Sequence, residues 1–262
     1  MKLALVTGAS KGFGKSLALE LAKHDYYVVG AARSEDKLIS LAEETKSSYI
    51  TFDGYDINSI TNLANKVINL SKDYDSIDVI AAADQHEDVS IVENGKKRFT
   101  TEGDFSEEYK EKAYLLAVEG PLALYNAFKK SNLPFNFFYI SSQAAGRFKN
   151  DLDFWKMGNS IYGPNKAKAE ELFSQYKNVS SLRYPFLDTE MADKMYEQLK
   201  YLDPVVHQDF DLSKPLRPKE EIFLPLEPVS LDTVSFVLGN KESFDKVSGN
   251  TYSYVKTVED FK

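Results

Sequence analysis

Cysteine is absent from this sequence of 262 residues, and its absence excludes disulfide bonds, thiolate nucleophiles and zinc sites built on thiolates. Long hydrophobic runs are absent as well. The opening MKLALVTGAS has too short an apolar stretch for a signal peptide, and no later stretch reaches the length of a membrane span. We therefore expect a cytoplasmic protein that has no membrane partner.

Positively charged residues are also fewer than negatively charged ones. Lys and Arg total 32 against 40 Asp and Glu, which gives a formal net charge of −8 at pH 7. A surface of this sign repels phosphate backbones, so nucleic acid is not an expected partner. The three histidines, His24, His86 and His207, do not have the spacing of metal ligands, and no metal site is predicted.

What the sequence does contain is an alternation of short apolar runs with amphipathic stretches. The apolar runs predict strands at 3–6, 26–31, 49–52, 77–83, 135–141, 179–184 and 251–255. Helical periodicity predicts helices after the first strand and at 34–46, 58–71, 106–130, 163–177 and 229–239. This order is typical of βαβ units, so we expect an α/β fold in which a doubly wound parallel sheet lies between two helical layers. A single domain over 1–262 is the simplest interpretation.

Residues 190–228 break the alternation and are rich in Pro, Lys, Glu and Asp. We interpret them as an insertion that forms a lid over a substrate, with an apolar face made by Met191, Met195, Tyr196 and Leu199. The alternative is a solvated loop without a role in binding.

The stretch TGASKGFG at 7–14 joins the first predicted strand to the first helix. Its three glycines, Gly8, Gly12 and Gly14, permit a tight turn and a close approach of the backbone to a pyrophosphate. The helix that follows offers unpaired N–H groups and the positive end of its dipole to the phosphates. A strand, a glycine-rich loop and a helix in this order predict a Rossmann-type dinucleotide-binding fold.

This loop resembles the cofactor loop of the short-chain dehydrogenase/reductase family. Further matches follow in the family's order: Asp56 after the third strand, YISS at 139–142, Tyr162 to Lys166 as Y-x-x-x-K, LDTEM at 187–191 and VSGN at 247–250. They span nearly the whole chain, which is thereby identified as a divergent member of that family.

The resemblance implies that Ser142, Tyr162 and Lys166 are catalytic. Tyr162 and Lys166 lie four residues apart, so they share one face of a helix. A nearby ammonium favours the phenolate and lowers the tyrosine pKa, which suits a phenol for general acid–base work. Ser142 would hold the substrate oxygen. The alternative is that both Tyr162 and Lys166 are ordinary surface residues.

The resemblance also implies a set of cofactor-binding residues. They are Gly8, Ser10, Lys11, Gly12, Phe13, Gly14, Arg33, Asp56, Ile57, Ala82, Ala83, Tyr162, Lys166, Pro185, Leu187 and Thr189. An acid at the end of the second strand selects NAD, but Ala32 stands there, followed by Arg33. Lys11 and Arg33 therefore favour NADP. Alternatively, Arg33 pairs with Glu35 and Lys11 is solvated.

Several positions depart from the family pattern. Ala82, Ala83, Asp84 and Gln85 stand where the family has Asn-Asn-Ala-Gly. Ala117 replaces an asparagine that in the family helps to hold a water linking the lysine to solvent, and Tyr184-Pro185 replaces Pro-Gly. An inserted stretch at 146–160 carries Trp155, which either lines a substrate pocket or closes a long loop.

Because the serine, tyrosine and lysine are all present, we favour an NADP-dependent oxidoreductase. It would reduce a carbonyl, or oxidise the corresponding alcohol, of a small to medium, partly apolar substrate. The alternatives are a weakly active or inactive NAD(P)-binding protein that senses redox state or binds a partner, and a dehydratase or epimerase. The resemblance further implies a homodimer or homotetramer that pairs through 106–130 and the helix after Tyr162.

Overall fold

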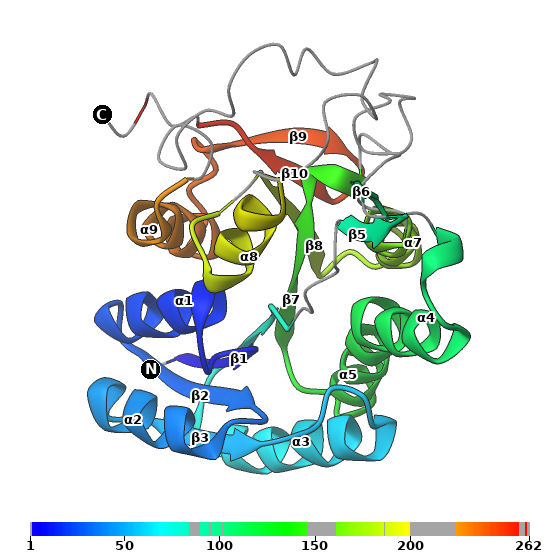
Figure 1. Cartoon of the computed structure of the whole chain (residues 1–262). Helices are drawn as coiled ribbons and strands as arrows, with labels where there is room; N and C mark the ends of the chain where they lie inside the picture. Colours follow the sequence, from blue (N-terminus) through cyan, green and yellow to red (C-terminus); the bar gives the residue numbers. More distant parts are fainter. Residues whose placement is uncertain are drawn as a thin grey trace.

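The structure, a computed structural model, describes residues 2–83, 90–94, 96–100, 102–145, 161–185, 187–199, 224–256 and 260. An eight-stranded sheet with the order β3-β2-β1-β4-β7-β8-β10-β9 forms its centre (Figure 1). The strands in chain order are β1 (Lys2–Thr7), β2 (Tyr26–Ala32), β3 (Ser48–Thr51), β4 (Ile77–Ala81), β7 (Phe135–Ser142), β8 (Val179–Tyr184), β9 (Phe244–Ser248) and β10 (Thr251–Tyr254). All neighbours are parallel except β9 and β10.

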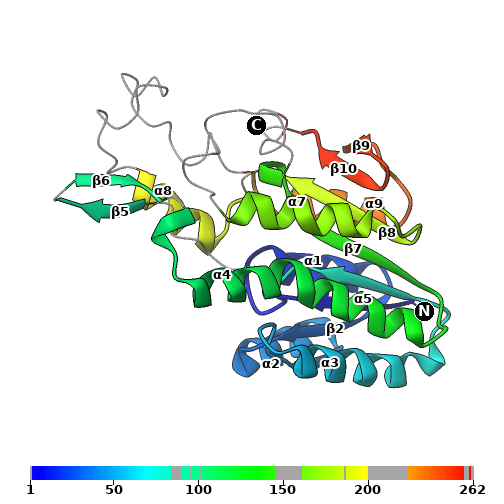
Figure 2. The same ribbon diagram turned by 90° about the vertical axis from the view of Figure 1, so that its right-hand side faces the viewer.

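Helices cover both faces of the sheet. The described helices are α1 (Gly12–Lys23), α2 (Glu35–Thr45), α3 (Ile57–Leu70), α4 (Glu107–Tyr114), α5 (Gly120–Lys130), α7 (Tyr162–Phe173), α8 (Glu190–Leu199) and α9 (Leu226–Val237), and α8 lies beyond the end of the sheet (Figure 2). One core cluster joins the sheet to α1, α2 and α9, and the other joins it to α3, α5 and α7. Figure 2 shows α5 and α7 side by side on the second face. The predicted doubly wound α/β fold with three layers is confirmed.

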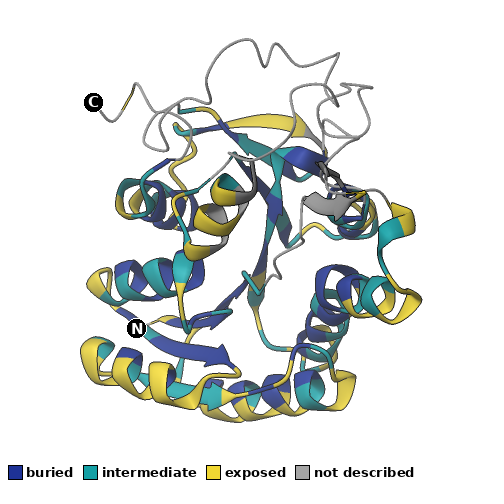
Figure 3. Cartoon of the chain, viewed as in Figure 1, coloured by how far each residue is buried: buried dark blue, intermediate teal, exposed yellow. Residues whose placement is uncertain are grey.

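Burial follows this layering. The inner strands β1 and β4 are buried along almost their whole length, while α2 and α3 expose their outer faces (Figure 3). A parallel strand covered on both faces has no solvent side, which explains why these strands are apolar runs rather than alternating patterns.

The predicted helix at 106–130 is continuous in space but not regular. A π-helical turn at Leu115–Glu119 separates α4 from α5. Pro121 explains the change, because a proline has no N–H to donate and its ring clashes with the carbonyl four residues earlier, which belongs to Ala117. The wider turn relieves that clash, and the predicted uniform helix was wrong in this detail.

Four elements were missing from the prediction. The polar stretch 87–104 contains a hairpin of two of them, β5 (Ser90–Glu93) and β6 (Lys96–Phe99), and the third, β9, pairs with β10 at the sheet edge. The fourth is α8, at the start of the expected insertion. In the edge strand β9, Asp245 and Lys246 are exposed. Charged side chains on an edge strand disfavour pairing with a strand of another chain, and they also interrupt the apolar run by which a strand is predicted.

Two expected segments cannot be compared with the structure. The stretch 146–160 lies outside the described residues, and so does 200–223 of the expected lid. Among the described residues, no helix combines the length and the apolar character that crossing a bilayer requires.

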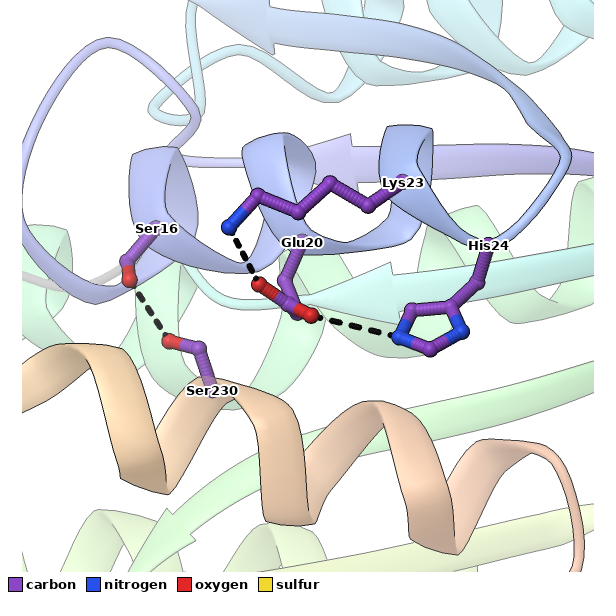
Figure 4. Close-up of polar contacts among 5 residues, drawn as sticks. All are labelled: Ser16, Glu20, Lys23, His24 and Ser230. Carbon is purple, nitrogen blue, oxygen red and sulfur yellow. Dashed lines mark hydrogen bonds and ion pairs between the residues drawn. The ribbon is translucent and has the colours of Figure 1, made fainter.

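Helix α1 begins in the glycine loop and packs against α9 on the same face of the sheet. Ser230 donates to Ser16 across the two helices, with 2.7 Å between the oxygens (Figure 4). On the same face Glu20 has a side chain only 9% exposed, and its carboxylate contacts Lys23 at 2.9 Å and His24 at 3.2 Å. These contacts fix the helix whose N-terminus faces the loop.

A buried ion pair fixes α7 on the sheet. Glu170 on α7 is 3% exposed and accepts two hydrogen bonds from Arg183 on β8, at 2.8 and 2.6 Å. Ser141 on β7 donates a third at 2.6 Å. A bidentate guanidinium–carboxylate pair is geometrically specific, so it sets the position of α7 along both strands.

We expect Arg183→Leu to lower the free energy of unfolding by roughly 3–5 kcal/mol, because it leaves the Glu170 carboxylate buried without a counter-charge. Denaturant titration measures the change. The double variant Glu170→Leu/Arg183→Leu removes both charges and should recover most of the loss. A single variant that unfolds at the wild-type denaturant concentration would contradict the role given to this pair.

Candidate active site at the carboxyl edge of the sheet

The predicted site residues come from loops that follow the carboxyl ends of neighbouring parallel strands. Strand β1 lies between β2 and β4, so the chain winds outward in opposite directions on either side of the β1–β4 pair. In open α/β sheets, ligands bind outside the carboxyl ends of the strands at such a switch point. The glycine loop after β1 lies at this point, and β7 and β8 carry Ser142 and Pro185 to the same edge.

The glycine loop contains a backbone contact that excludes any side chain. Gly8 has a φ of +71°, and a Cβ atom there would lie 2.8 Å from the Ala82 carbonyl oxygen and 2.9 Å from the Ala83 Cα. At Gly14 a Cβ would lie 2.5 Å from the Gly8 carbonyl oxygen. Both glycines are therefore required by close packing of the loop on itself and on the end of β4.

Thr7 joins the same two strands by hydrogen bonds. Its buried Oγ1 accepts from the backbone N–H groups of Ala82 and Ala83, at 3.1 and 3.2 Å. Backbone donors thus connect β4 to β1 at the positions where the family has asparagines. The substitution of alanine at these two positions leaves this link intact.

The start of α1 is suited to an anion. Gly12 has a φ of +54°, and a Cβ there would meet only the side chain of Thr189, at 3.6 Å and beyond. The described first turn of α1 contains no acidic residue, and Lys11 at its N-cap makes no side-chain capping bond. The N–H groups of this turn and the helix dipole therefore favour a negatively charged group in front of the loop.

The side chains of Lys11 and Arg33 are both exposed, and each contacts another side chain. The Nζ of Lys11 lies 2.9 Å from Oε2 of Glu190, the first residue of α8. The hydrogen bond from Lys11 lowers the pKa of the Glu190 carboxyl, and the charge of Lys11 adds to the effect. The guanidinium of Arg33 lies 5.2 Å from the centre of the Tyr55 ring, while Glu35 accepts from Tyr49.

Asp56 and Ile57 begin α3 behind the end of β3. The Asp56 carboxylate caps the helix by accepting from the Asn58 N–H at 2.9 Å. Ile57 is 38% exposed, although isoleucine is among the residue types most often buried. Ile57 offers an apolar surface and Asp56 a hydrogen-bond acceptor, and together they match the needs of a flat, partly polar ring.

The Tyr162 and Lys166 pair lies where α7 meets the sheet. Tyr162 is the first residue of α7, and Lys166 follows one turn later. The Lys166 ammonium lies 5.4 Å from the centre of the Tyr162 ring and donates to the Ile140 carbonyl at 3.0 Å. Gly163 lets the helix approach closely, because a Cβ there would lie 3.2 Å from the Ala144 carbonyl oxygen.

Ser142 is the last residue of β7, and its hydroxyl oxygen accepts from the Ala144 N–H at 3.2 Å. A hydroxyl has one donor proton in addition to its acceptor lone pairs. Ser142 therefore keeps a donor that can meet a substrate oxygen.

The segment after β8 lies against the glycine loop. Leu187 forms a bridge with Leu224, and the Asp188 N–H donates to the Leu224 carbonyl at 2.8 Å. Tyr184, which stands where the family has proline, packs edge-on against Phe13 at 4.9 Å between ring centres. Burial raises the pKa of its phenol, whose hydroxyl bonds to Thr233.

Comparison with solved structures places this arrangement among known folds. An alcohol dehydrogenase from the archaeon Thermococcus sibiricus, complexed with 5-hydroxy-NADP, matches with a TM-score of 0.68 at 22% identity, covering 97% of this chain and 95% of that one. A short-chain dehydrogenase from Streptomyces avermitilis matches with a TM-score of 0.70 at 18% identity, covering 99% and 90%. At these identities the likeness establishes the fold.

Sequence relatives match a shorter stretch. An NADPH-dependent pterin aldehyde reductase from Arabidopsis thaliana is 41% identical over 71 residues, which is 26% of this chain and 29% of that protein. The chain thus spans less than a third of the length of the curated relatives it matches. The model of the short chain dehydrogenase family matches residues 2–111.

The chain matches the short-chain dehydrogenase family over residues 2–111. The family match covers β1 to α4, and the fold of the remaining described residues continues the same architecture. The resemblance noted from the glycine loop is thereby supported, and the fold extends it to the rest of the described chain.

Two residues contact members of the candidate site, and the spacing of the motifs does not reveal these contacts. Glu190 contacts Lys11 across 179 positions of sequence, and the ring of Tyr139 contacts the Lys166 ammonium. Both lie inside quoted motifs, LDTEM and YISS, but no sequence spacing relates them to their partners. In the described residues, no group of three or more His, Cys, Asp or Glu side chains is placed to hold a metal ion.

We expect Gly8→Ala to destabilise this protein by about 2–5 kcal/mol, because a left-handed backbone conformation and a clash with the Ala82 carbonyl add together. Gly249 is a matched control, since it has a φ of +49° but nothing within 4 Å of the position that a Cβ atom would take. Gly249→Ala should therefore cost only about 1–2 kcal/mol. Thermal unfolding compares the two, and equal losses would refute the close contact at Gly8.

Proposed function

We propose that this protein is an NADP-dependent oxidoreductase that reduces a carbonyl, or oxidises the corresponding alcohol, by hydride transfer. The observation that carries the proposal is the Lys166 ammonium held against the Tyr162 ring at the carboxyl edge of the sheet. A relative described as NADPH-dependent and a structural neighbour complexed with 5-hydroxy-NADP support the choice of cofactor.

The residues present fit a dinucleotide. The contact at Gly8 and the open face of Gly12 leave a cradle of bare backbone in front of α1, where a pyrophosphate would be held. Ile57 and Asp56 would receive the adenine, and the 2′-phosphate would lie between Lys11 and Arg33. Ala82, Ala83, Pro185, Leu187 and Thr189 would border the nicotinamide half, together with Lys166.

A bound nicotinamide cofactor supplies or accepts the hydride. The protein's own residues handle the substrate oxygen and its proton. Ser142 donates a hydrogen bond to that oxygen while negative charge develops on it. Tyr162 gives its phenolic proton to the oxygen during reduction and takes it back during oxidation. Lys166 stabilises the phenolate that remains, because its ammonium lies one helical turn away on the same face.

The substrate enters beside the segment that follows β8. Thr189 lies against Gly12, and α8 begins there with its contact to Lys11. This placement supports a lid formed by 190–228 that closes over both ligands. We propose a small to medium substrate with apolar surface, since the sequence of 146–160, which lies outside the described residues, contains Phe148, Phe154 and Trp155.

The cofactor assignment predicts that Lys11→Ala/Arg33→Ala raises the dissociation constant for NADPH by about tenfold or more, because two charged donors to the 2′-phosphate are lost. The constant for NADH should stay within about twofold. Titration followed by nicotinamide fluorescence and calorimetry measures both. Lys168→Ala is the control, since Lys168 forms a similar exposed pair with Glu171 on α7. An unchanged preference in the double variant would disprove the assignment.

The catalytic assignment predicts that Tyr162→Phe lowers kcat by at least about a hundredfold while NADPH affinity is kept, because the proton donor is lost and the ring remains. Tyr252→Phe is the matched control, since Tyr252 also lies beside a lysine, with Lys241 at 4.8 Å from its ring centre, but on β10. It should keep full activity toward a panel of aldehydes and ketones.

The same experiment separates the main alternative. If wild-type protein binds NADPH but reduces nothing in the panel, a binding role without turnover is supported. Turnover that survives in Tyr162→Phe would instead refute the tyrosine as the proton donor.

A further inference from the structure

Lys166 is buried more deeply than an ammonium normally is, with 2% of the residue exposed. An ammonium has three donors, and burial is costly unless its charge is compensated. One donor is directed to the Ile140 carbonyl at 3.0 Å. Two aromatic rings also face the charge: that of Tyr162 at 5.4 Å and that of Tyr139 at 5.0 Å from ring centre to nitrogen. Both distances are within the range of cation–π attraction.

The ring of Tyr139 is itself held rigidly. It is 1% exposed on β7, and its hydroxyl donates to the Ala117 carbonyl at 2.8 Å. It packs on Phe173 of α7 with 5.3 Å between ring centres. The side chain thus connects the sheet, the π-helical turn and α7.

The acceptor at Ala117 follows from the sequence of the π-helical turn. In an α-helix the carbonyl of Ala117 would receive the N–H of residue 121, but Pro121 has none. A buried carbonyl needs a partner, and the Tyr139 hydroxyl supplies one. Proline in the helix therefore creates the anchor that holds the ring beside Lys166.

Two further charged groups on this side of α7, Glu170 and Arg183, bind each other. Glu170, one turn beyond Lys166, accepts from Arg183 of β8 and from Ser141 of β7. Its negative charge is matched by the guanidinium, so Glu170 and Arg183 act on Lys166 as a neutral pair. Ser142 on β7 is uncharged, and the π-helical turn presents a backbone carbonyl.

We propose that Tyr139 is a positioning residue that holds the Lys166 ammonium against Tyr162. Its ring face attracts the charge from the sheet side, and its hydroxyl, fixed on Ala117, keeps the ring in place. This inference rests on the proposed function only in that Tyr162 is taken as the proton donor. The residue touches neither reacting atom, and it acts through Lys166.

The test compares three substitutions. Tyr139→Leu removes the ring and the hydroxyl, and Tyr139→Phe keeps the ring while leaving the Ala117 carbonyl without its donor. Phe137→Leu is the matched control, since Phe137 lies two residues earlier on β7, is fully buried and packs on Phe173 at 5.3 Å. If Tyr139→Leu does not fold, Tyr139→Met replaces it, because methionine fills irregular gaps without an aromatic face.

The first measurement needs no cofactor or substrate. Protein labelled at the tyrosine ζ-carbon is titrated by NMR, and the Tyr162 signal is assigned as the one missing in Tyr162→Phe. Moving an ammonium away from a phenol disfavours the phenolate, so the measured pKa of Tyr162 should rise in Tyr139→Leu by roughly half a unit or more. Tyr139→Phe should raise it by less, because the ring remains but loses its anchor on Ala117, and Phe137→Leu should stay near the wild-type value.

The second measurement is the pH profile of kcat/KM for alcohol oxidation. In Tyr139→Leu the profile should move upward in pH by the same amount as the NMR titration. A shift of about half a pH unit corresponds to a change of about threefold in kcat/KM at a fixed pH below the midpoint. Tyr139→Phe should move the profile by less than Tyr139→Leu, because it keeps the ring and loses only the anchor. Phe137→Leu should lose stability without moving it.

The outcomes separate this inference from the proposed function. A Tyr162 titration that moves in Tyr139→Leu, in a protein that turns over no carbonyl or alcohol, supports the positioning role and counts against the oxidoreductase. An active enzyme whose titration and profile are the same in Tyr139→Leu as in wild type overturns the positioning role. A shift of equal size in Phe137→Leu overturns it too, because core packing alone would then account for the effect.

Discussion

Two charged side chains one helical turn apart on α7 are buried against the sheet, and the rest of the site depends on how their charges are satisfied. Glu170 is fixed by the guanidinium of Arg183 and the hydroxyl of Ser141. Lys166 is held by the Ile140 carbonyl and by aromatic rings. Burying either charge alone would be strongly unfavourable, so α7 has one position in which both are compensated. That position puts Tyr162 at the carboxyl edge of the sheet.

The glycine loop imposes the second constraint, and it is steric. Gly8 and Gly14 are fixed by backbone atoms that leave no room for a Cβ, and Thr7 holds β4 in register beside the loop. The compensated charges fix α7 on β7 and β8, and the close backbone packing fixes the glycine loop at the β1–β4 switch point. The glycine loop and the Tyr162–Lys166 pair are therefore on regular, packed elements, which suits the proposed reaction because it needs fixed distances.

The departures from the family pattern become intelligible in three dimensions. Tyr184 in place of proline fills a cluster of rings between Phe13, Phe244 and Tyr254. Alanine at 117 offers only its backbone carbonyl, and that carbonyl is taken by the Tyr139 hydroxyl. In both places an aromatic side chain occupies the region of the substitution, so these changes alter packing without removing Ser142, Tyr162 or Lys166.

The sequence alone determined the order of strands and helices, because the inner strands are covered on both faces and must be apolar throughout. It also indicated that Gly8, Gly12 and Gly14 form a loop of bare backbone between a strand and a helix, but only the structure shows the backbone contacts that require Gly8 and Gly14. Short charged edge strands such as β9 were not predictable, because they lack an apolar run. Only the tertiary structure decided that Lys11 meets Glu190 and that Tyr139 meets Lys166. Those contacts join residues that are not neighbours in the chain, and they follow from where α7 and α8 lie in the fold rather than from any local spacing.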